Sequence, residues 1–202
     1  TGDNTSFDDA GVQWIINPWD ELALTRAMEL KEAGGVDTIT VANVGEKSTE
    51  PTLRKALAVG ADDAIRIDAP AKDAFFVAAQ LAEVAKGYDL ILAGIEASDY
   101  NGNALGGLLA EILDFNSVSA VSGINIEGDS FKVNREIDGG SQVLTISGPL
   151  VAIVQKGIAK EPRIPAMRGI MMARKKPLVV APPVDAHEKT QFVNFELPPP
   201  KA

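Results

Sequence analysis

The chain has 202 residues, of which 28 are acidic and 19 basic, and its formal net charge is -9. The length suits one sizeable domain with an appendage, and the negative charge opposes attraction to the phosphate backbone of nucleic acids. The absence of cysteine excludes disulfides, zinc thiolate sites and thiol nucleophiles. No apolar stretch reaches the ~18 residues that span a bilayer, and no signal-peptide pattern follows Thr1. We therefore expect an intracellular protein without direct membrane insertion.

In the first half of the chain, helical and strand patterns alternate. The first helix begins at Asn17-Pro18, with asparagine as N-cap and proline at the first helical position, and ends at Gly34-Gly35. Apolar runs predict strands at 38–44, 64–67 and 90–93, and apolar residues at helical spacing predict helices at 48–60, 73–86 and 104–113. This alternation predicts an α/β fold with an open, mostly parallel, doubly wound sheet. The opening residues 1–11 are polar and turn-rich, where such a fold usually has its first strand.

The pattern changes after Val118. Alternating apolar residues with turns at Gly128-Asp129 and at 138–140 predict antiparallel strands added to the same sheet, and the apolar run 150–154 predicts a buried strand. From Pro177 onward the tail holds six prolines, Pro177 included, and few periodic apolar residues, which predicts an extended C-terminal arm. We therefore divide the chain into an α/β domain, 1–176, and an arm, 177–202. The single histidine, His187, lies in this arm and is a poor candidate for a catalytic base or metal ligand.

Three segments are predicted to lie at the carboxyl ends of the strands, where open α/β sheets bind nucleotides. They are the helix start at Asn17, the strand end at Val44-Gly45 and the long loop that leads into the helix at 104–113. The loop combines small residues, polar donors and a helix N-terminus, which suits a phosphate: Ser98, Asp99, Tyr100, Asn101, Gly102, Asn103, Ala104, Leu105, Gly106 and Gly107. A plain turn, or close packing of the helix on the sheet at Gly106-Gly107, explains the same residues. Neither the Walker A nor the GxGxxG spacing is present, which disfavours a P-loop hydrolase or an ordinary NAD site.

A second candidate surface is a basic segment rich in proline and methionine. It comprises Glu161, Pro162, Arg163, Ile164, Pro165, Ala166, Met167 and Arg168, and it runs on to Arg174-Lys175-Lys176. Apolar residues between prolines and charges suit a small, reversible protein interface. Two alternatives stay open: Ile164 and Met167 pack under their own domain, and the basic cluster is a solvated face. The carboxylates Glu136 and Asp138 belong to a predicted hairpin turn, so we read them as structural and predict no catalytic residue.

One succession of motifs resembles a known family. The hairpin motif Arg135-x-x-Asp138-Gly139-Gly140, the buried strand 150–154 and the loop Glu161-Pro162-Arg163 resemble the β subunit of the electron transfer flavoproteins, over nearly the whole chain. The resemblance implies an adenine nucleotide-binding fold, with the loop at 98–107 around the phosphate of AMP, or of a second FAD in members that bifurcate electrons. It also implies that Asn17, Pro18, Trp19, Asp20 and Val44 flank the adenosine. In the family a first strand precedes the stretch matching 1–11 and contributes a nucleotide contact, so we expect this chain to be shortened there.

The resemblance further implies partners. An α subunit would hold the redox FAD and receive the arm after Pro177, and the segment 161–171 would dock on flavin-dependent dehydrogenases such as acyl-CoA dehydrogenases, with Met167 entering a pocket. Electrons would pass on to a membrane quinone reductase, and the location would be the bacterial cytoplasm or the mitochondrial matrix. Because Tyr100-Asn101-Gly102 departs from the commoner Gln-Thr-Gly-containing form, the choice of AMP over FAD stays open. The alternatives are a free-standing adenine-nucleotide-binding regulator and, less favoured, a nucleotide hydrolase or ligase, for which no metal-binding carboxylate cluster is evident.

Overall fold

The structure, a computed structural model, describes residues 5, 6, 8 and 10–196. Its elements in chain order are α1 (Pro18–Glu32), β1 (Thr40–Val44), the 3-10 turn η1 (Lys47–Thr49), α2 (Glu50–Val59), β2 (Asp63–Ile67), α3 (Ala74–Ala85), β3 (Leu90–Gly94), α4 (Leu105–Leu113), β4 (Asn116–Glu127), β5 (Ser130–Ile137), β6 (Gly140–Ser147), β7 (Leu150–Val154), α5 (Met167–Ala173) and β8 (Leu178–Ala181). The predicted helices and strands of the first half are confirmed. The short elements α5 and β8 were not predicted.

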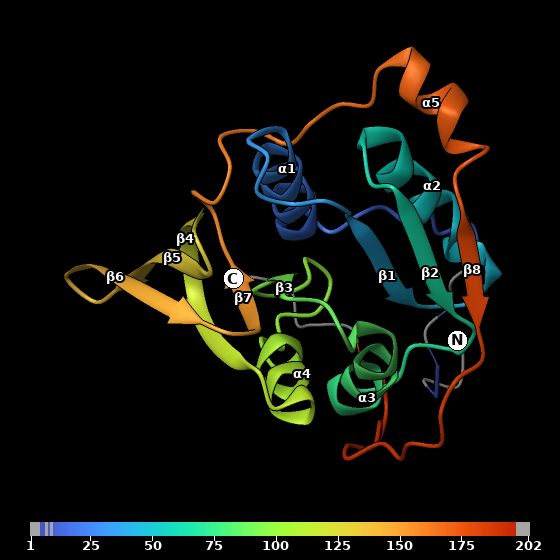
Figure 1. The fold of residues 1–202 in the computed structure, drawn as a ribbon. Coiled ribbons are helices and arrows are strands. Elements are labelled where there is room, and N and C mark those ends of the chain that lie inside the picture. The colour runs from blue at the N-terminus through green and yellow to red at the C-terminus, as the bar shows by residue number, and fades with distance from the viewer. Residues whose placement is uncertain (1–4, 7, 9, 197–202) are drawn as a thin grey trace, which may run out of the picture.

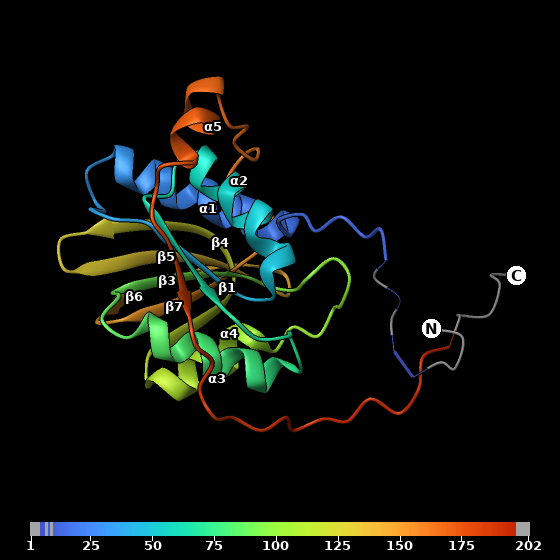
Figure 2. The same cartoon turned by 90° about the vertical axis from the view of Figure 1, so that its right-hand side faces the viewer.

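The strands form a layer between two layers of helices. Figure 1 shows α1, α2 and α5 on one side of the strands and α3 and α4 on the other. The predicted α/β fold with mostly parallel strands is therefore confirmed, and the antiparallel meander β4-β5-β6 is joined to the parallel strands through β7. Seen from the side in Figure 2, the first and the last described residues of the chain both extend away from this body.

The strands divide into two sheets that are not hydrogen-bonded to each other. One sheet has the order β1-β2-β8 and is parallel, and the other has the order β3-β7-β4-β5-β6. A doubly wound sheet with the order 3-2-1-4-5 would place its first strand between our β1 and β3. No strand precedes Pro18 among the described residues. The strand that would join the two halves is not among them, so the predicted doubly wound sheet is present as two parts.

A cavity of about 510 Å³ occupies the position between β1 and β3. It is lined by both strands and by the facing sides of α1 and α3. All residues of β3 are only half-buried and Ala42 of β1 is exposed, whereas β7 is fully buried. This cavity, called the gap below, separates the facing edges of β1 and β3.

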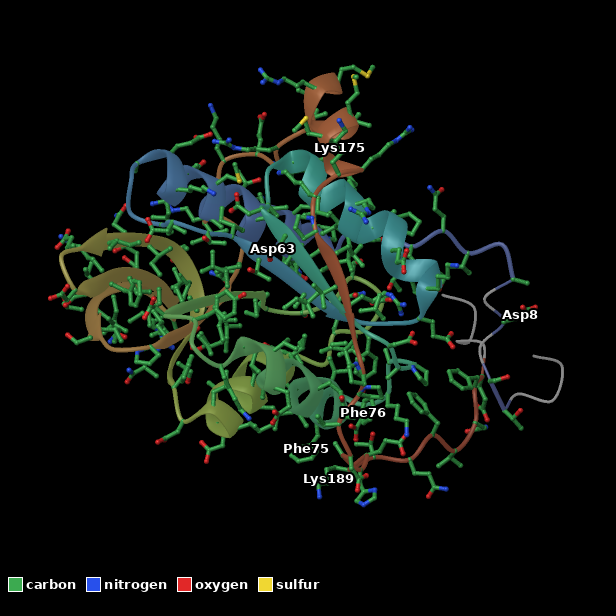
Figure 3. The ribbon with its side chains drawn as sticks, turned by 45° about the vertical axis from the view of Figure 1, so that its right-hand side comes forward. Asp8, Asp63, Phe75, Phe76, Lys175 and Lys189 are labelled. Carbon is green, nitrogen blue, oxygen red and sulfur yellow. The ribbon has the colours of Figure 1, made fainter. Side chains whose placement is uncertain are left out.

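The first part of the arm after β8 is hydrogen-bonded to α3 and its N-cap. Gln80, a buried residue of α3, donates to the Val184 carbonyl oxygen at 2.8 Å and accepts from the Val184 N–H at 2.7 Å. Asp73 caps α3 and also accepts from the N–H groups of Lys189 and Thr190, while the Lys189 ammonium lies over the Phe75 ring (Figure 3). The predicted arm therefore contains a sheet strand, β8, followed by an extended segment from 182 onward, and its residues 197–202 lie outside the described part.

The gap predicts an alternating pattern of amide hydrogen exchange within single strands. Because Gly45 N–H bonds to Ile67 of β2 and Ile95 N–H bonds to Val154 of β7, alternate amides of β1 and β3 face the gap. We expect the amides of Ala42 and Leu92 to exchange at least about tenfold faster than those of their neighbours Asn43 and Ala93. Deuterium exchange followed by NMR measures these rates. Equal protection of neighbouring amides would mean that the gap is closed in solution.

Candidate functional site

The side chain of Asn17 joins the start of α1 to the loop after β3. Its amide donates to the Glu96 carbonyl oxygen at 2.8 Å, and its carbonyl oxygen accepts from the Ser98 N–H at 3.1 Å. Asn17 occupies the predicted N-cap position, and Pro18 the first turn, but the Asn17 side chain makes no capping hydrogen bond. This corrects the prediction of a side-chain cap. Because the amide reaches across to the loop, two of the predicted segments meet at the carboxyl end of β3.

Asp20 completes this junction by pairing with the edge of β3. Its carboxylate accepts from Asn17 Nδ2 at 2.8 Å and from the Gly94 N–H at 2.7 Å, so it satisfies an amide that faces the gap. Burial raises the pKa of the Asp20 carboxyl, and the hydrogen bonds from Asn17 and Gly94 partly offset that rise. A Cβ atom at Gly94 would lie 2.8 Å from Trp19 Cβ and 3.0 Å from Asn17 Nδ2. Only glycine lets α1 approach the strand this closely.

The end of β1 is fixed by a buried arginine that the sequence reasoning missed. Arg66 of β2 is 4% exposed, donates to the Gly45 carbonyl oxygen at 2.8 Å and pairs with Asp68 and Glu50. A charged residue inside the short apolar strand 63–67 was the available signal. Beside it, Val44 is buried, and Asn43 Oδ1 is a buried acceptor without a partner among the described residues. Asn17, Asp20, Asn43 and Val44 all line the cavity between β1 and β3, so its wall becomes polar at the carboxyl ends.

The loop at 98–107 lies at the same end of the sheet and is open to solvent. Residues 98–104 are exposed, and the side chain of Tyr100 is 72% exposed. The two glycines that end the loop differ in role. A Cβ at Gly106 would lie 2.6 Å from Ile153 of β7, so Gly106 allows α4 to pack on the sheet, whereas nothing lies within 4 Å of a Cβ at Gly107. Close packing of the helix on the sheet therefore explains Gly106. It does not explain Gly107, which is exposed.

The electrostatics of this loop come from backbone groups. No Lys or Arg occurs between Lys86 and Lys132, and no side chain caps the N-terminus of α4. The first N–H groups of α4 and its dipole supply positive potential at this end of the helix, which favours a phosphate. Within the described part of the chain, no group of three or more His, Asp or Glu residues is placed to hold a metal ion.

The second predicted surface, around α5, presents apolar side chains to solvent. Ile164 is 90% exposed, Met167 74% and Met171 66%. Ile164 and Met167 therefore do not pack under their own domain, and that alternative is wrong. Glu161, Pro162 and Arg168 are also exposed, and Pro165 is half-buried. None of the described helices is long and apolar enough to cross a membrane.

The basic residues around α5 attach it to the domain. Arg163 makes two hydrogen bonds to the Glu32 carboxylate of α1, at 2.6 and 2.5 Å, and its own N–H bonds to Thr25. These bonds lower the pKa of Glu32 and raise that of Arg163. At the other end, Arg54 of α2 donates to the carbonyl oxygens of Ala173 and Lys176. Lys176 donates in turn to Leu57 and Ala61 carbonyl oxygens at the end of α2, so it is not part of a solvated face.

Comparison with known proteins identifies the family. The chain matches the family described as "Electron transfer flavoprotein domain" over residues 4–186. It is 40% identical to "Electron transfer flavoprotein subunit beta" of Syntrophomonas wolfei over 198 residues, which cover 96% of this chain and 78% of that protein. This chain belongs to the electron transfer flavoprotein β subunits. Proteins of the same name from Bacillus subtilis and Homo sapiens are each 35% identical, over 96% and 98% of this chain and 80% and 81% of their own lengths.

Membership gives the chain an electron transfer flavoprotein β role and confirms the resemblance seen in its motifs. The name that these relatives share describes an electron transfer flavoprotein. The site residues themselves are not named by these comparisons. Their roles in binding a nucleotide or a partner therefore stay predictions.

Replacing Asp20 with asparagine tests the energetic cost of this buried carboxylate. Because the folded-state pKa of Asp20 lies above its ordinary value of 3.8, its contribution to stability is full below 3.8 and is lost as the pH rises through the folded pKa. We expect the unfolding free energy of the natural protein, minus that of Asp20→Asn, to fall as the pH rises from below 3.8 toward neutrality.

Urea unfolding of both proteins across this pH range measures the difference. The carboxyls whose pKa values are lowered, those of Glu32, Asp62 and Asp73, titrate in both proteins and cancel in the subtraction. A difference that stays constant, or that grows with pH, would contradict the raised pKa of Asp20.

Proposed function

We propose that this chain is the β subunit of a heterodimeric electron transfer flavoprotein that binds AMP and carries electrons from flavin-dependent dehydrogenases to a membrane quinone reductase. Its α subunit would hold the FAD, which supplies the redox chemistry when bound. The observation that carries the nucleotide part is the junction of Asn17 and Asp20 with Gly94, Glu96 and Ser98. This junction brings the start of α1 and the loop leading to α4 together at the carboxyl ends of the strands.

The nucleotide proposal divides the ligand between two regions. The open N-terminus of α4, with Gly107 exposed and the loop at 98–104 around it, suits the phosphate. Asn17, Pro18, Trp19, Asp20 and Val44 suit the adenosine, and Asn43 Oδ1, which has no hydrogen-bond partner among the described residues, offers an acceptor for an exocyclic amine. The carboxylates Asp20 and Asp99 make the site a poor place for a polyphosphate, which favours AMP over ATP. In a bifurcating complex the adenosine and phosphate of a second FAD would use the same contacts.

The docking proposal depends on a rigid platform beneath exposed apolar groups. Arg163, Arg54 and Lys176 hold α5 and its preceding loop to α1 and α2 through hydrogen bonds that leave Ile164 and Met167 exposed. An anchor that is already positioned loses little conformational entropy on binding. Methionine adapts to differently shaped pockets, which suits a carrier that meets several dehydrogenases. Arg168, Arg174 and Lys175 would rim the contact with positive charge.

The arm would complete the heterodimer. Beyond its attachment to Asp73, the arm exposes Phe192 at 66% and Val193 at 88%, which suits packing against the α subunit. We keep the division into a nucleotide-binding domain, 1–176, and an arm, 177–202, as a functional one, although β8 belongs to the sheet. The compartment proposed is the bacterial cytoplasm, or the mitochondrial matrix in a eukaryote.

The composition of the purified complex tests this function. Coexpression with the α subunit, purification, denaturation and chromatography with mass detection should yield one FAD and one AMP per heterodimer. Two FAD per heterodimer would indicate a bifurcating carrier instead. If no heterodimer forms and the chain alone releases ATP or ADP, the proposal is wrong and a free-standing nucleotide-binding regulator replaces it.

A charge at Gly107 should block the phosphate position. Gly107→Asp places a carboxylate at an exposed site with no atom within 4 Å of its Cβ, so folding should be unaffected while repulsion lowers AMP affinity on the order of tenfold or more. Gly107→Ala is the matched control and should keep the nucleotide. The measurement is AMP retained per FAD after dialysis, and full retention by Gly107→Asp would move the phosphate away from α4.

Truncation of Met167 should weaken docking without touching the flavin. For Met167→Ala we expect the KM of the dehydrogenase for this carrier to rise about tenfold with kcat nearly unchanged, because an apolar anchor is lost. The readout is the initial rate of flavin reduction at varied carrier concentration. Val143→Ala removes an exposed apolar group from β6, which the proposal assigns to no interface, and serves as the control. An unchanged KM for Met167→Ala would place the docking surface elsewhere.

A further inference from the structure

The methionines of this chain are concentrated on one short helix. The sequence has four methionines, and three of them, Met167, Met171 and Met172, lie on α5 with 74, 66 and 48% of each residue exposed. The fourth, Met28 of α1, is half-buried, and its thioether lies against Gly60 at the end of α2. The chain therefore has one cluster of exposed thioethers, on α5, and one half-buried methionine, Met28, with which they can be compared.

Exposed thioethers are sites of oxygen transfer. Hydrogen peroxide gives one oxygen atom to the sulfur as its O–O bond breaks, so the sulfur loses two electrons, the peroxide is reduced to water, and a sulfoxide remains. The sulfoxide is polar and accepts hydrogen bonds, whereas the thioether is an apolar, adaptable group. Oxidation at α5 would thus turn an apolar surface into a polar one.

Among the described residues, the hydrogen bonds that attach α5 use backbone and arginine groups and none of its sulfur atoms. The helix rests on α2 where Gly169 approaches the backbone of Ala58, a position that leaves no room for a Cβ. At the end of the helix, Arg54 donates to the Ala173 carbonyl oxygen. In the loop before the helix, the Arg163 guanidinium donates to the Glu32 carboxylate. Oxidation of the three methionines would therefore change the exposed face while the helix stays in place. Met28 differs, because it packs in the core between α1 and α2.

We propose that Met167, Met171 and Met172 form a methionine oxidation site, and that peroxide acting on it lowers the affinity of this chain for its dehydrogenase. The effect on docking rests on the proposed function of α5. Sulfoxides are reversible through methionine sulfoxide reductases, so the site provides a redox control of electron entry that leaves the nucleotide site and the flavin untouched.

Peptide mapping by mass spectrometry tests the site directly. The intact heterodimer is treated with hydrogen peroxide, the reaction is stopped with catalase, and sulfoxide at each methionine is followed in time. We expect Met167, Met171 and Met172 to oxidise at least about tenfold faster than Met28. Equal rates for all four methionines would overturn the oxidation site.

Kinetics on the same samples test the consequence. The KM of the dehydrogenase for the oxidised carrier should rise about fivefold or more and return after treatment with both sulfoxide reductases. In the triple variant M167L/M171L/M172L, the ratio of the KM after peroxide treatment to the KM before it should stay near one, whatever the starting KM, because leucine has no sulfur to oxidise. An unchanged KM after full oxidation of the three residues would overturn the control of docking. Failure of the untreated heterodimer to dock would instead reject the proposed role of α5, while the mapping still decides whether the oxidation site exists.

Discussion

The structure depends on two helices that hold together two sheets with no backbone hydrogen bond between them. Helix α1 contributes Leu22, Ala23 and Leu30 to the core beside β7 and β4, and Leu24 to the core beside β1 and α2. Helix α3 does the same from the other side, since Phe76 packs beside β1 and β2 whereas Ala78 and Ala82 pack against α4. Side-chain packing across the helices therefore replaces the ladder that an intervening strand would supply.

Polar contacts close the two ends of this gap. At the amino ends of the strands, the Tyr88 hydroxyl donates a hydrogen bond to the Thr40 hydroxyl at 2.7 Å. At the carboxyl ends, the Asp20 carboxylate accepts a hydrogen bond from the Gly94 N–H. The second contact belongs to the candidate nucleotide site. The same carboxylate thus stabilises an unpaired strand edge and positions the loop that is proposed to hold a phosphate, which ties the integrity of the sheet to that of the site. Burying it has a cost, because its charge is poorly solvated there.

The two proposed functional surfaces share one design, in which fixed groups support open ones. At the nucleotide site, Asn17, Asp20 and Arg66 fix the backbone at 94–98 and at Gly45, while the residues at 98–104 stay open. At α5, the half-buried Arg163 pairs with Glu32 while Met167 is exposed. The residues that the family resemblance assigned to these surfaces therefore fall into two groups. Some hold the surface in position, and others are exposed and can contact a partner. Arg163 and Lys176 belong to the first group, although a basic loop alone would suggest the second.

The sequence by itself determined the alternation of helices and strands, the antiparallel meander, the extended end of the chain and the family. These follow from local signals, such as the apolar periodicity and the glycines and prolines that end each element. Only the tertiary structure decided that Asn17 bonds across 79 positions to Glu96 instead of capping its helix, and that Arg163 bonds across 131 positions to Glu32. It also separated Gly106, which packs on Ile153, from Gly107, which is open. Such distinctions depend on which residues the packing brings together, and periodicity along the chain carries no record of those neighbours. The seven-residue helix α5 escaped prediction for the same reason, because contacts with α2 stabilise it where its own propensity does not.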